Sequence, residues 1–364
     1  MTDRKYPLAR PPGHKPPVQR WRLEYPEDTP AVHTAYVGVQ RHDDSHDTRA
    51  AFAIAVEEVE KWVASTQVEH TGGSKGEAFR VLDGDDTAHD SVLWVCYWPD
   101  MAAYQVAMDR LQLTTIYHMC PGATSIGLYC ERFTTPISRL ETNYSGLDYL
   151  PGVARLPGPN PTEHTLTAYW GAARDRIPSA AQDAFSRATP EATQPPVAVP
   201  SGLGQRLVGR NPYDNLVHIR SGQFWQRCEA AETEAYETLL EPTLKAGLQY
   251  LWQNRDESGA MGLRFLRNQH PQEAEPPSQP AKETCAAGFF RNLQDLEKWA
   301  KRHPSHLAIF NGALKHAKVF GNDRKMRTWH EVSVLKTGDA QFEYVNCQPQ
   351  TGVISYFQLE EEDL

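Results

Sequence analysis

Several short stretches of the chain alternate hydrophobic and polar residues, as strands do when they bury one face of a sheet. Other stretches repeat hydrophobic residues at the three- and four-residue spacing of an amphipathic helix. The first pattern predicts strands over residues 33–40, 91–98, 125–132, 214–221, 262–266, 284–290 and 328–335. The second pattern predicts helices over 49–64, 99–113, 224–252, 293–302 and from 304 onwards.

The order strand–helix–strand occurs in both halves of the sequence, which favours two related α+β units with helices over one face of each sheet. A length of 364 residues is about two to three times the commonest single-domain size and agrees with two units. Proline-rich segments interrupt the pattern and indicate where the units begin and end. We therefore expect an extended arm over 1–30, a first unit over 31–155, a second over 156–352 with surface loops at 189–201 and 269–281, and a solvated acidic tail over 353–364.

Composition and charge narrow the classes of function. Hydrophobic residues make up 40% of the chain and charged residues 23%, as in an ordinary globular protein. No apolar run is long enough to cross a bilayer, and the net charge of −9 argues against a nucleic-acid binder. The six cysteines lie far apart, and the first residues do not resemble a secretory signal. We therefore expect a cytoplasmic protein with reduced thiols that binds a small molecule and neither nucleic acid nor membrane.

Two histidines stand on faces that the pattern predicts to be apolar. Positions 306, 309, 310, 313, 314 and 317 form one helical stripe, and His306 begins it. The residue is either a hydrogen-bonded core histidine or a ligand of haem or metal, because an imidazole presented from an apolar wall suits axial ligation. His330 shares a strand face with Val332 and Val334, where a basic group needs a partner or a function.

Ser221 ends a strand and shares its face with Val217 and Ile219. A serine in this position is either hydrogen-bonded to the backbone or directed toward a site. Familiar phosphate-binding loops, dinucleotide-binding glycine motifs and nucleophile elbows are absent from the sequence, so none of these sites supports an assignment.

Six short motifs, taken together and in order, resemble the aldoxime dehydratases, the haem enzymes that convert aldoximes into nitriles. The resemblance runs from about residue 34 to residue 352. Its motifs are Leu-Glu-Thr at 140–142 before Leu-Pro-Gly-Val at 150–153, Gly-Ala-Ala-Arg-Asp-Arg at 171–176 after Tyr-Trp, Ile-Arg-Ser-Gly-Gln at 219–223, Ser-His-Leu-Ala-Ile-Phe at 305–310, His-Glu-Val-Ser-Val at 330–334 and Glu-Tyr-Val-Asn-Cys at 343–347.

The resemblance implies a fold and a set of site residues. The fold would be α+β, with two ferredoxin-like halves forming a dimeric α+β barrel with flanking helices, and the protein would be a homodimer. By position, His306 matches the proximal ligand of haem b, and His330 matches the distal catalytic histidine. Ser221 matches the distal serine, Arg176 a distal-pocket arginine and Glu141 a pocket carboxylate.

The resemblance also implies a mechanism, in which the aldoxime nitrogen binds ferrous haem iron. Ser221 would orient the oxime oxygen, and His330 would act as general acid and base. Arg176 and Glu141 would set the charge around His330, although Glu141 could equally be a structural ion-pair partner. The alternatives are a haem peroxidase of the same fold group and a haem-binding or sensing dimer without turnover. The sequence leaves open whether the substrate is an aryl, arylalkyl or alkyl aldoxime.

Overall fold

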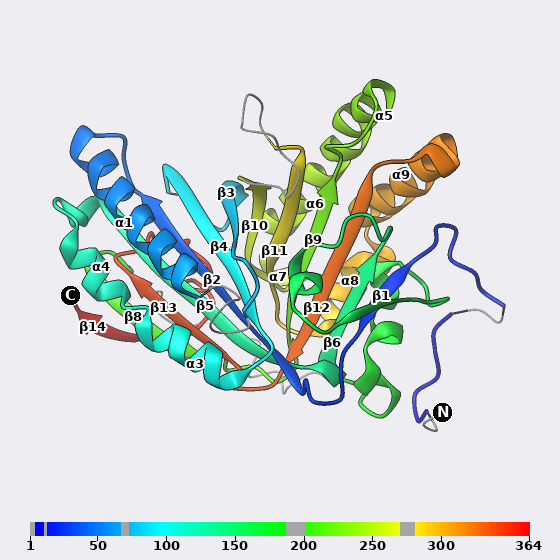
Figure 1. Cartoon of the computed structure of the whole chain (residues 1–364), viewed down its shortest axis with the longest axis horizontal. Coiled ribbons are helices and arrows are strands. Elements are labelled where there is room, and N and C mark those ends of the chain that lie inside the picture. The colour runs from blue at the N-terminus through cyan, green and yellow to red at the C-terminus, as the bar shows by residue number, and fades with distance from the viewer. Residues whose placement is uncertain (1–3, 11–12, 67–72, 87, 187–200, 270–280) are drawn as a thin grey trace.

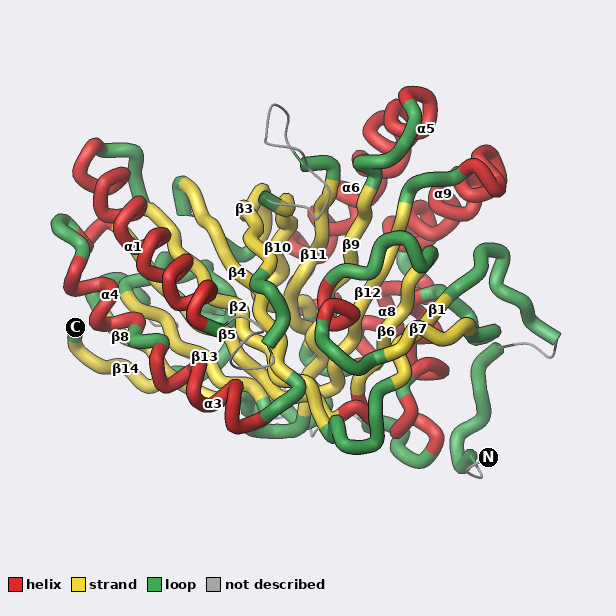
Figure 2. The backbone as a smooth tube through the Cα atoms, viewed as in Figure 1, coloured by secondary structure: helices red, strands yellow, loops and turns green. Residues whose placement is uncertain are grey.

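The structure, a computed structural model, describes residues 4–10, 13–66, 73–86, 88–186, 201–269 and 281–364. Its described strands form one antiparallel sheet in the order β14-β8-β13-β5-β2-β4-β3-β10-β11-β9-β12-β6-β1-β7. The sheet curves strongly, and helices cover its outer side in two groups (Figures 1 and 2). The fold is therefore mixed, with a large antiparallel sheet and flanking helices.

Two blocks of four strands occupy the middle of the sheet. The first block holds β2 (Ala31–Arg41), β3 (Glu77–Gly84), β4 (Asp90–Trp98) and β5 (Ile126–Pro136), with α1 (His46–Ser65), α3 (Met101–Arg110) and α4 (Leu113–Met119). The second block holds β9 (Leu216–Phe224), β10 (Ala260–Asn268), β11 (Glu283–Phe290) and β12 (Arg327–Leu335), with α5 (Ala230–Ala235), a π-helical turn η7 (Tyr236–Leu240), α6 (Glu241–Gln253), α7 (Arg255–Ser258), α8 (Leu293–Arg302) and α9 (Pro304–Phe320).

Both blocks have the same connectivity. In chain order each runs βαββαβ, and in the sheet its fourth strand lies beside its first, followed by its third and second. The second strands of the two blocks, β3 and β10, pair with each other and join the blocks edge to edge. The chain order of elements predicted from periodicity thus corresponds to a repeated arrangement in space.

The outer edges of the blocks exchange strands. After β5 the chain enters β6 (Leu140–Tyr144), which pairs with β12 of the second block, and β1 (Trp21–Glu24) and β7 (Asn160–Glu163) extend that edge. After β12 the chain enters β13 (Ala340–Val345), which pairs with β5 of the first block, and β8 (Gln205–Arg210) and β14 (Glu360–Asp363) extend it. The sequence ranges 31–155 and 156–352 are therefore interleaved at the sheet edges.

Three large hydrophobic clusters of the described residues fill the layers, and a small fourth one contains Trp225, Tyr236 and Met326. One lies between the outer face of the first block and α1, α3 and α4. A second lies between the outer face of the second block and α6, α8 and the 3₁₀ segment η5 (Pro178–Ala181). The third lies where the inner faces of the blocks meet. There the ring of Phe133 on β5 is 4.6 Å from that of His218 on β9 and 6.2 Å from that of Phe289 on β11, between centroids.

A carboxylate is held at equivalent places in the two blocks, 200 positions apart. Glu331 on β12 accepts a hydrogen bond from the Val153 amide at 2.8 Å, and a Cβ atom on Gly152 would lie 2.0 Å from its Oε1. Glu131 on β5 stands in the same relation to Gly352, whose Cβ would also lie 2.0 Å from Oε1. Both glycines have positive φ, +67° and +54°. The duplication therefore extends to the loops that enclose each carboxylate.

The boundaries of two predicted helices are wrong. The helix expected over 99–113 begins at Met101, because Asp100 caps it by accepting a hydrogen bond from the Ala103 amide at 2.8 Å. It ends at Arg110, where Leu111 adopts an extended conformation, and α4 follows as a separate helix. The helix expected over 224–252 begins only at Ala230, because Phe224 is still paired in the sheet with β11 and β12.

The arm and the tail contribute more to the fold than the sequence indicates. Within the arm predicted over 1–30, β1 is paired in the sheet and Leu23 is buried. Within the tail predicted over 353–364, Val353 and Phe357 belong to the inner cluster, and the exposed acidic residues form β14. Their acidic side chains are solvated as expected, but their backbone is paired. The loops predicted at 189–201 and 269–281 lie almost entirely outside the described residues.

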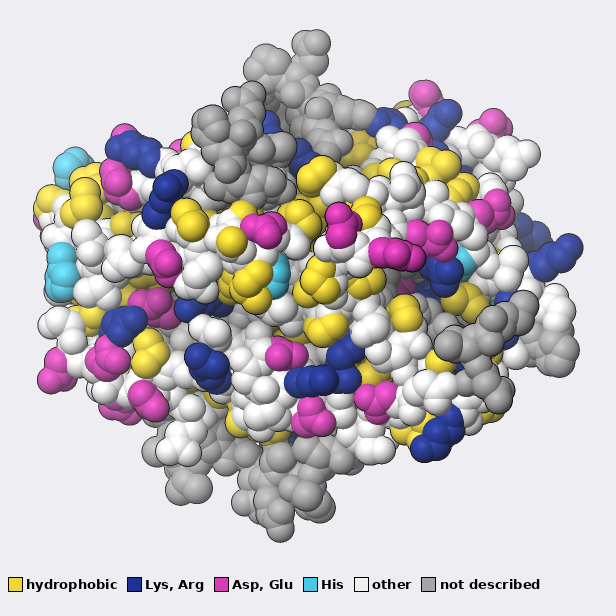
Figure 3. All heavy atoms as spheres, turned by 60° about the horizontal axis from the view of Figure 1, so that its bottom comes forward, with side chains coloured by type: hydrophobic (Ala, Val, Ile, Leu, Met, Phe, Trp, Pro, Cys, Tyr) yellow, Lys and Arg dark blue, Asp and Glu magenta, His cyan; other side chains and the backbone are white. Residues whose placement is uncertain are grey.

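The surface carries both signs of charge. On the face seen in Figure 3, acidic and basic side chains are interspersed, with hydrophobic side chains scattered between them. None of the helices in the described ranges is both long and apolar enough to cross a bilayer. All six cysteines are free thiols, and five of them are buried.

Replacing Gly352 with alanine tests the enclosure of Glu131. The control is Gly338→Ala. Gly338 also has a positive φ, +83°, but an added Cβ would have no atom within 4 Å of it. The control should therefore cost only the penalty of a left-handed backbone, about 1–2 kcal/mol. Gly352→Ala adds the clash with Glu131 and should destabilise by roughly 1–3 kcal/mol more. Thermal unfolding midpoints of both variants measure the difference. Equal midpoints would mean that the carboxylate moves aside without cost.

Candidate active site

A long cavity lies between the outer face of the second block and the helices that cover it. It encloses about 1340 Å³ of space not filled by atoms, counting its open mouth. All six residues of the stripe predicted on α9 line this cavity, namely His306, Ile309, Phe310, Ala313, Leu314 and Ala317. These residues thus face a cavity and not a packed core, and among the described residues of α9 only His306 and His316 are buried.

His306 projects into this cavity from the first turn of α9, which begins with Pro304 at a position that suits proline. Three aromatic rings enclose its imidazole. The ring centroids of Trp299, Trp170 and Tyr169 lie 4.7, 5.5 and 5.7 Å from that of His306. The rings fix the direction of the imidazole without neutralising a charge on it.

The imidazole of His306 is neutral near pH 7. Burial lowers its pKa to about 4, although the nearby carbonyl group of Ala300 favours the charged form. Its Nδ1 atom is buried and meets no hydrogen-bond partner of good geometry among the described residues. A neutral imidazole directed from an apolar wall into a cavity has the properties of an iron ligand, so these residues fit a haem held by His306.

Three polar side chains form a row across the sheet, on the face that the cavity exposes. His330 on β12 lies directly opposite Ser221 on β9 and directly opposite Asn143 on β6. Residues opposite each other in an antiparallel pair point to the same face, so all three side chains reach the cavity that contains His306. The faces predicted for Ser221 and His330 are those observed.

Behind this row lies a buried cluster of charge. Glu141 Oε1 lies 3.0 Å from Nε2 of His330 and forms an ion pair with Nε of Arg176. Nη2 of Arg176 lies 3.1 Å from the same His330 nitrogen. The side chains of Arg176 and Glu141 have no exposed surface and do not line the cavity. The structure therefore brings all the predicted distal residues together, with Arg176 and Glu141 behind His330.

The electrostatic balance at His330 follows from these contacts. Burial alone would raise the pKa of Glu141, but the charges of Arg176 and His330 outweigh it and hold the pKa at about 2. Burial lowers the pKa of His330 below its usual value, while Glu141 opposes the change and Arg176 reinforces it. Glu141 is thus ionised throughout the neutral range, and His330 is a weak base whose protonation depends on Glu141.

The two ring nitrogens of His330 have different surroundings. Nε2 lies near the Glu141 carboxylate and near two N–H donors, from Arg176 and Asn143, and a proton on Nε2 can be donated only to the carboxylate. No described residue forms a hydrogen bond with Nδ1, and the residue lines the cavity. In this tautomer Nδ1 is the nitrogen free to exchange a proton with a ligand.

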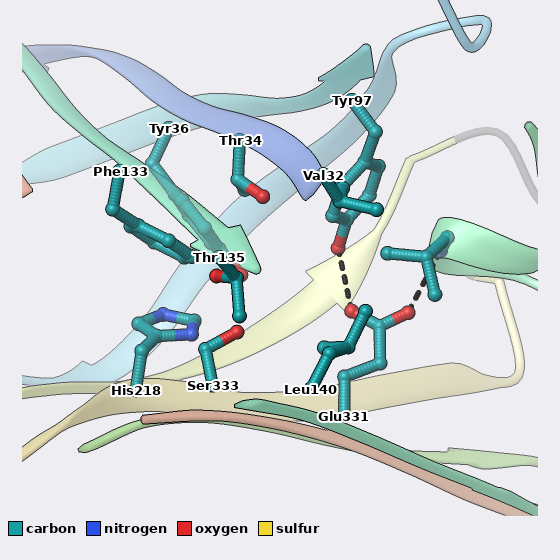
Figure 4. A pocket seen from close by; sticks show the side chains of 11 residues that line it. Val32, Thr34, Tyr36, Tyr97, Phe133, Thr135, Leu140, His218, Glu331 and Ser333 are labelled. Carbon is teal, nitrogen blue, oxygen red and sulfur yellow. Dashed lines mark hydrogen bonds between the residues drawn. The ribbon is translucent and has the colours of Figure 1, made fainter. Parts of the chain in front are cut away.

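The opposite face of the same strands carries a separate polar cluster. Glu331, next to His330, accepts a hydrogen bond from the Tyr97 hydroxyl at 2.8 Å, and Arg220, next to Ser221, pairs with Glu77 at 2.7 Å. Glu331 and Tyr97 border the small inner cavity of Figure 4, where their hydrogen bond is visible. Burial raises the pKa of Glu331 to about 7, because Arg220 only partly offsets the loss of solvent.

Sequence reasoning missed two contributions to the outer cavity. Asn143 stands two residues after Glu141, so alternation along the strand could have placed it on the same face. The N-terminal arm also lines the cavity, through His14, Pro17, Val18 and Arg20. A proline-rich segment gives no periodic signal, and this contribution therefore had no counterpart in the sequence pattern.

Comparison with known proteins gives consistent matches over nearly the whole chain. The model of the haem-containing dehydratase family matches residues 35–353. A phenylacetaldoxime dehydratase of Bacillus sp. (strain OxB-1) is 31% identical, with 96% of this chain and 95% of the relative covered. An aliphatic aldoxime dehydratase of Pseudomonas chlororaphis is 29% identical, with 94% and 92% covered.

Solved structures match over the same extent. A crystal structure of an aldoxime dehydratase is similar with a TM-score of 0.78 and 28% identity, covering 98% of this chain and 97% of that one. A second, of an aldoxime dehydratase in complex with butyraldoxime, has a TM-score of 0.78 and 26% identity, covering 98% and 94%. The mixed fold described above is thus one that these proteins share.

Burial of a neutral His306 predicts how stability depends on pH. Between pH 6.5 and about 4 the unfolded chain binds this proton and the folded chain does not, so stability falls as the pH falls. The shift corresponds to about 3 kcal/mol. His306→Leu should remove this part of the loss, whereas His118→Leu, at an exposed site, should keep it. Urea unfolding of haem-free protein across this range measures the effect, and parallel curves for all three proteins would contradict it.

Proposed function

The chain belongs to the family of haem-containing dehydratases, and we propose that it converts aldoximes, R–CH=N–OH, into nitriles and water. The observation that carries the proposal is the placement of one neutral histidine, His306, in the same apolar cavity as the row formed by Ser221, His330 and Asn143. One wall can hold a haem, and the other presents a hydroxyl and a proton-exchanging imidazole. Both are needed to remove a hydroxyl group from nitrogen and a proton from carbon.

Haem b is the proposed cofactor, with the imidazole of His306 as the protein ligand of its iron. When bound in the ferrous state, it would supply an iron that can act as a Lewis acid toward the oxime nitrogen and donate electron density, without net redox change. The neutral state of His306 suits this role, because no proton must leave the imidazole first.

Ser221 orients the oxime in this proposal. Its hydroxyl lines the cavity directly opposite His330 in the sheet, so it can donate a hydrogen bond to the oxime oxygen beside the proton donor. Both positions are fixed by backbone pairing and not by a mobile loop. The oxygen that must leave is thereby held next to the nitrogen that protonates it.

His330 moves the proton. In its protonated form, Nδ1 donates a proton to the oxime oxygen, the N–O bond breaks and water departs. The neutral imidazole then accepts the proton from the oxime carbon, and the C–H electron pair completes the C≡N bond. His330 returns to its protonated form, so one aldoxime gives one nitrile and one water.

Arg176 and Glu141 are positioning residues in this scheme, because neither lines the cavity. Glu141 holds Nε2 of His330 and favours its protonated form. Arg176 fixes Glu141 and also donates to the carbonyl of Tyr169 at 3.2 Å, which ties it to the segment carrying Trp170. The pair thus links the orientation of His330 to an aromatic ring that contacts both histidines.

The substrates we propose are aldoximes with apolar R groups, both aryl and alkyl. The names of two relatives refer to phenylacetaldoxime and to aliphatic aldoximes, and a related structure contains butyraldoxime. Apolar side chains dominate the cavity wall of this chain, among them Leu240, Leu244, Leu248, Ile309 and Phe310. The family resemblance further supports two proposals, that the blocks are the ferredoxin-like halves of a dimeric α+β barrel and that the protein is a homodimer.

An anaerobic assay of haem-loaded, dithionite-reduced protein with phenylacetaldoxime and butyraldoxime tests the activity. Nitrile, followed by gas chromatography, should form only in the reduced state. His330→Ala should nearly abolish nitrile formation while haem remains bound, and His306→Ala should lose haem or its normal spectrum. Ser221→Ala should cost about 1–3 kcal/mol of transition-state stabilisation, as expected for one hydrogen bond.

Three outcomes would contradict these assignments. Unchanged turnover of His330→Ala would exclude it as the acid–base group. Peroxide-dependent dye oxidation without nitrile would favour a peroxidase. Bound haem with neither activity would favour a carrier or sensor.

Glu141→Gln tests the positioning role through a pH profile. Protonated His330 is needed for the first proton transfer, so kcat/KM should fall as the pH rises through the His330 pKa. Glu141 raises that pKa, and its neutral replacement should therefore move the fall to lower pH. Glu343→Gln, at a carboxylate on β13 that pairs with Arg206 and does not line the cavity, should leave the profile unchanged. A lower rate with an unshifted profile would assign Glu141 a purely structural role.

A further inference from the structure

The charges on the outer cavity wall are unbalanced. Two arginines, Arg20 and Arg324, line the cavity, and no aspartate or glutamate among the described residues lines it. An unpaired charge on a largely apolar wall is costly unless a ligand of opposite charge occupies the site. Arg20 and Arg324 are half-buried, and the fully buried arginines of the described chain have carboxylate partners, as in the pair of Arg264 with Glu131 at 2.7 Å.

Arg20 is placed there by the N-terminal arm, immediately before β1. Its Nη1 donates a hydrogen bond to Oγ1 of Thr328 at 3.3 Å. Its Nε is buried and has no partner within the described ranges, where no carboxylate forms an ion pair with this side chain. Burial and the charges of Arg324 and Arg176 lower the pKa of Arg20 to about 9, which reflects the lack of a nearby anion.

Arg324 follows the 3₁₀ turn η8 (Gly321–Asp323) at the end of α9. Within the described ranges, its guanidinium donates one hydrogen bond, from Nη2 to the carbonyl of Ser145 at 3.4 Å. The two carboxylates nearby are engaged elsewhere. Glu232 accepts hydrogen bonds from the backbone amides of Lys325 and Met326, at 2.8 and 3.0 Å. Asp148 forms an ion pair with Arg327. Arg324 thus reaches the cavity without a partner of its own.

We propose that Arg20 and Arg324 bind the two propionate groups of the haem. This inference rests on the proposed function. The ligand that the wall suits has a flat apolar body and two carboxylates at one edge, and Thr328, which contacts Arg20, stands two residues before His330 on the same strand. Arg20 therefore lies beside the distal row, and together with Arg324 on the same cavity wall it would hold the carboxylates of the haem.

The same chemistry could serve a carboxylate on a substrate, and haem affinity distinguishes the two sources. Haem-free full-length protein is titrated with haem b and, separately, with its dimethyl ester, whose propionates carry no charge. Arg20→Gln and Arg324→Gln should each weaken haem binding about tenfold and leave binding of the ester as in the unsubstituted protein. Arg20→Lys should keep most of the haem affinity, and Lys325→Gln, exposed beside Arg324, should have no effect.

Each alternative outcome overturns the proposal in a recognisable way. Unchanged haem affinity in both glutamine variants removes the arginines from the haem site while haem binding itself stands. If the glutamine variants bind haem and its dimethyl ester equally more weakly, the role of the two arginines is structural. Unchanged haem affinity with a raised KM for a carboxylate-bearing aldoxime assigns them to the substrate. If the unsubstituted protein binds neither haem nor ester, the proposed function itself fails.

Discussion

The register of β12 against its neighbours is the constraint on which the site depends. Opposite residues share a face, so a shift of one residue would turn His330 inward and bring Glu331 to the cavity. The inner face opposes that shift, because Glu331 is bound by the Val153 amide and the Tyr97 hydroxyl. The polar cluster between the blocks and the row on the outer face are therefore two sides of one arrangement.

Charge is distributed around the row so that one group remains free to titrate. Glu141 and Arg176 neutralise each other without contact with solvent, which leaves His330 beside a permanent anion and a permanent cation. The site thus obtains a defined imidazole orientation from buried charge, while the cavity in front stays largely apolar. His306 on the opposite wall has no such partners and owes its neutrality to burial.

Periodicity and ordered motifs predicted much of this arrangement. The helical stripe identified the wall that carries His306, strand alternation gave the faces of His330 and Ser221, and the family resemblance is confirmed. Contacts between distant segments could not be predicted from the local pattern. The contact between Glu141 and His330, which are 189 positions apart in the sequence, is an example. Nor could the exchange of strands between blocks, since nothing in the local pattern of β6 and β13 indicates which strand each one pairs with.

The two repeated blocks differ in what covers their outer faces. In the first block the positions that match Ser221, His330 and Asn143 are Val37, Cys130 and Glu343, and Val37 and Cys130 belong to the cluster packed beneath α1, α3 and α4. In the second block α9 stands away from the sheet and leaves room for a ligand. The first block is thus closed at the place where the second holds a cavity. Substitutions that enlarge the cavity therefore leave the packing beneath α1, α3 and α4 untouched, and the cost in stability is confined to one of the two blocks.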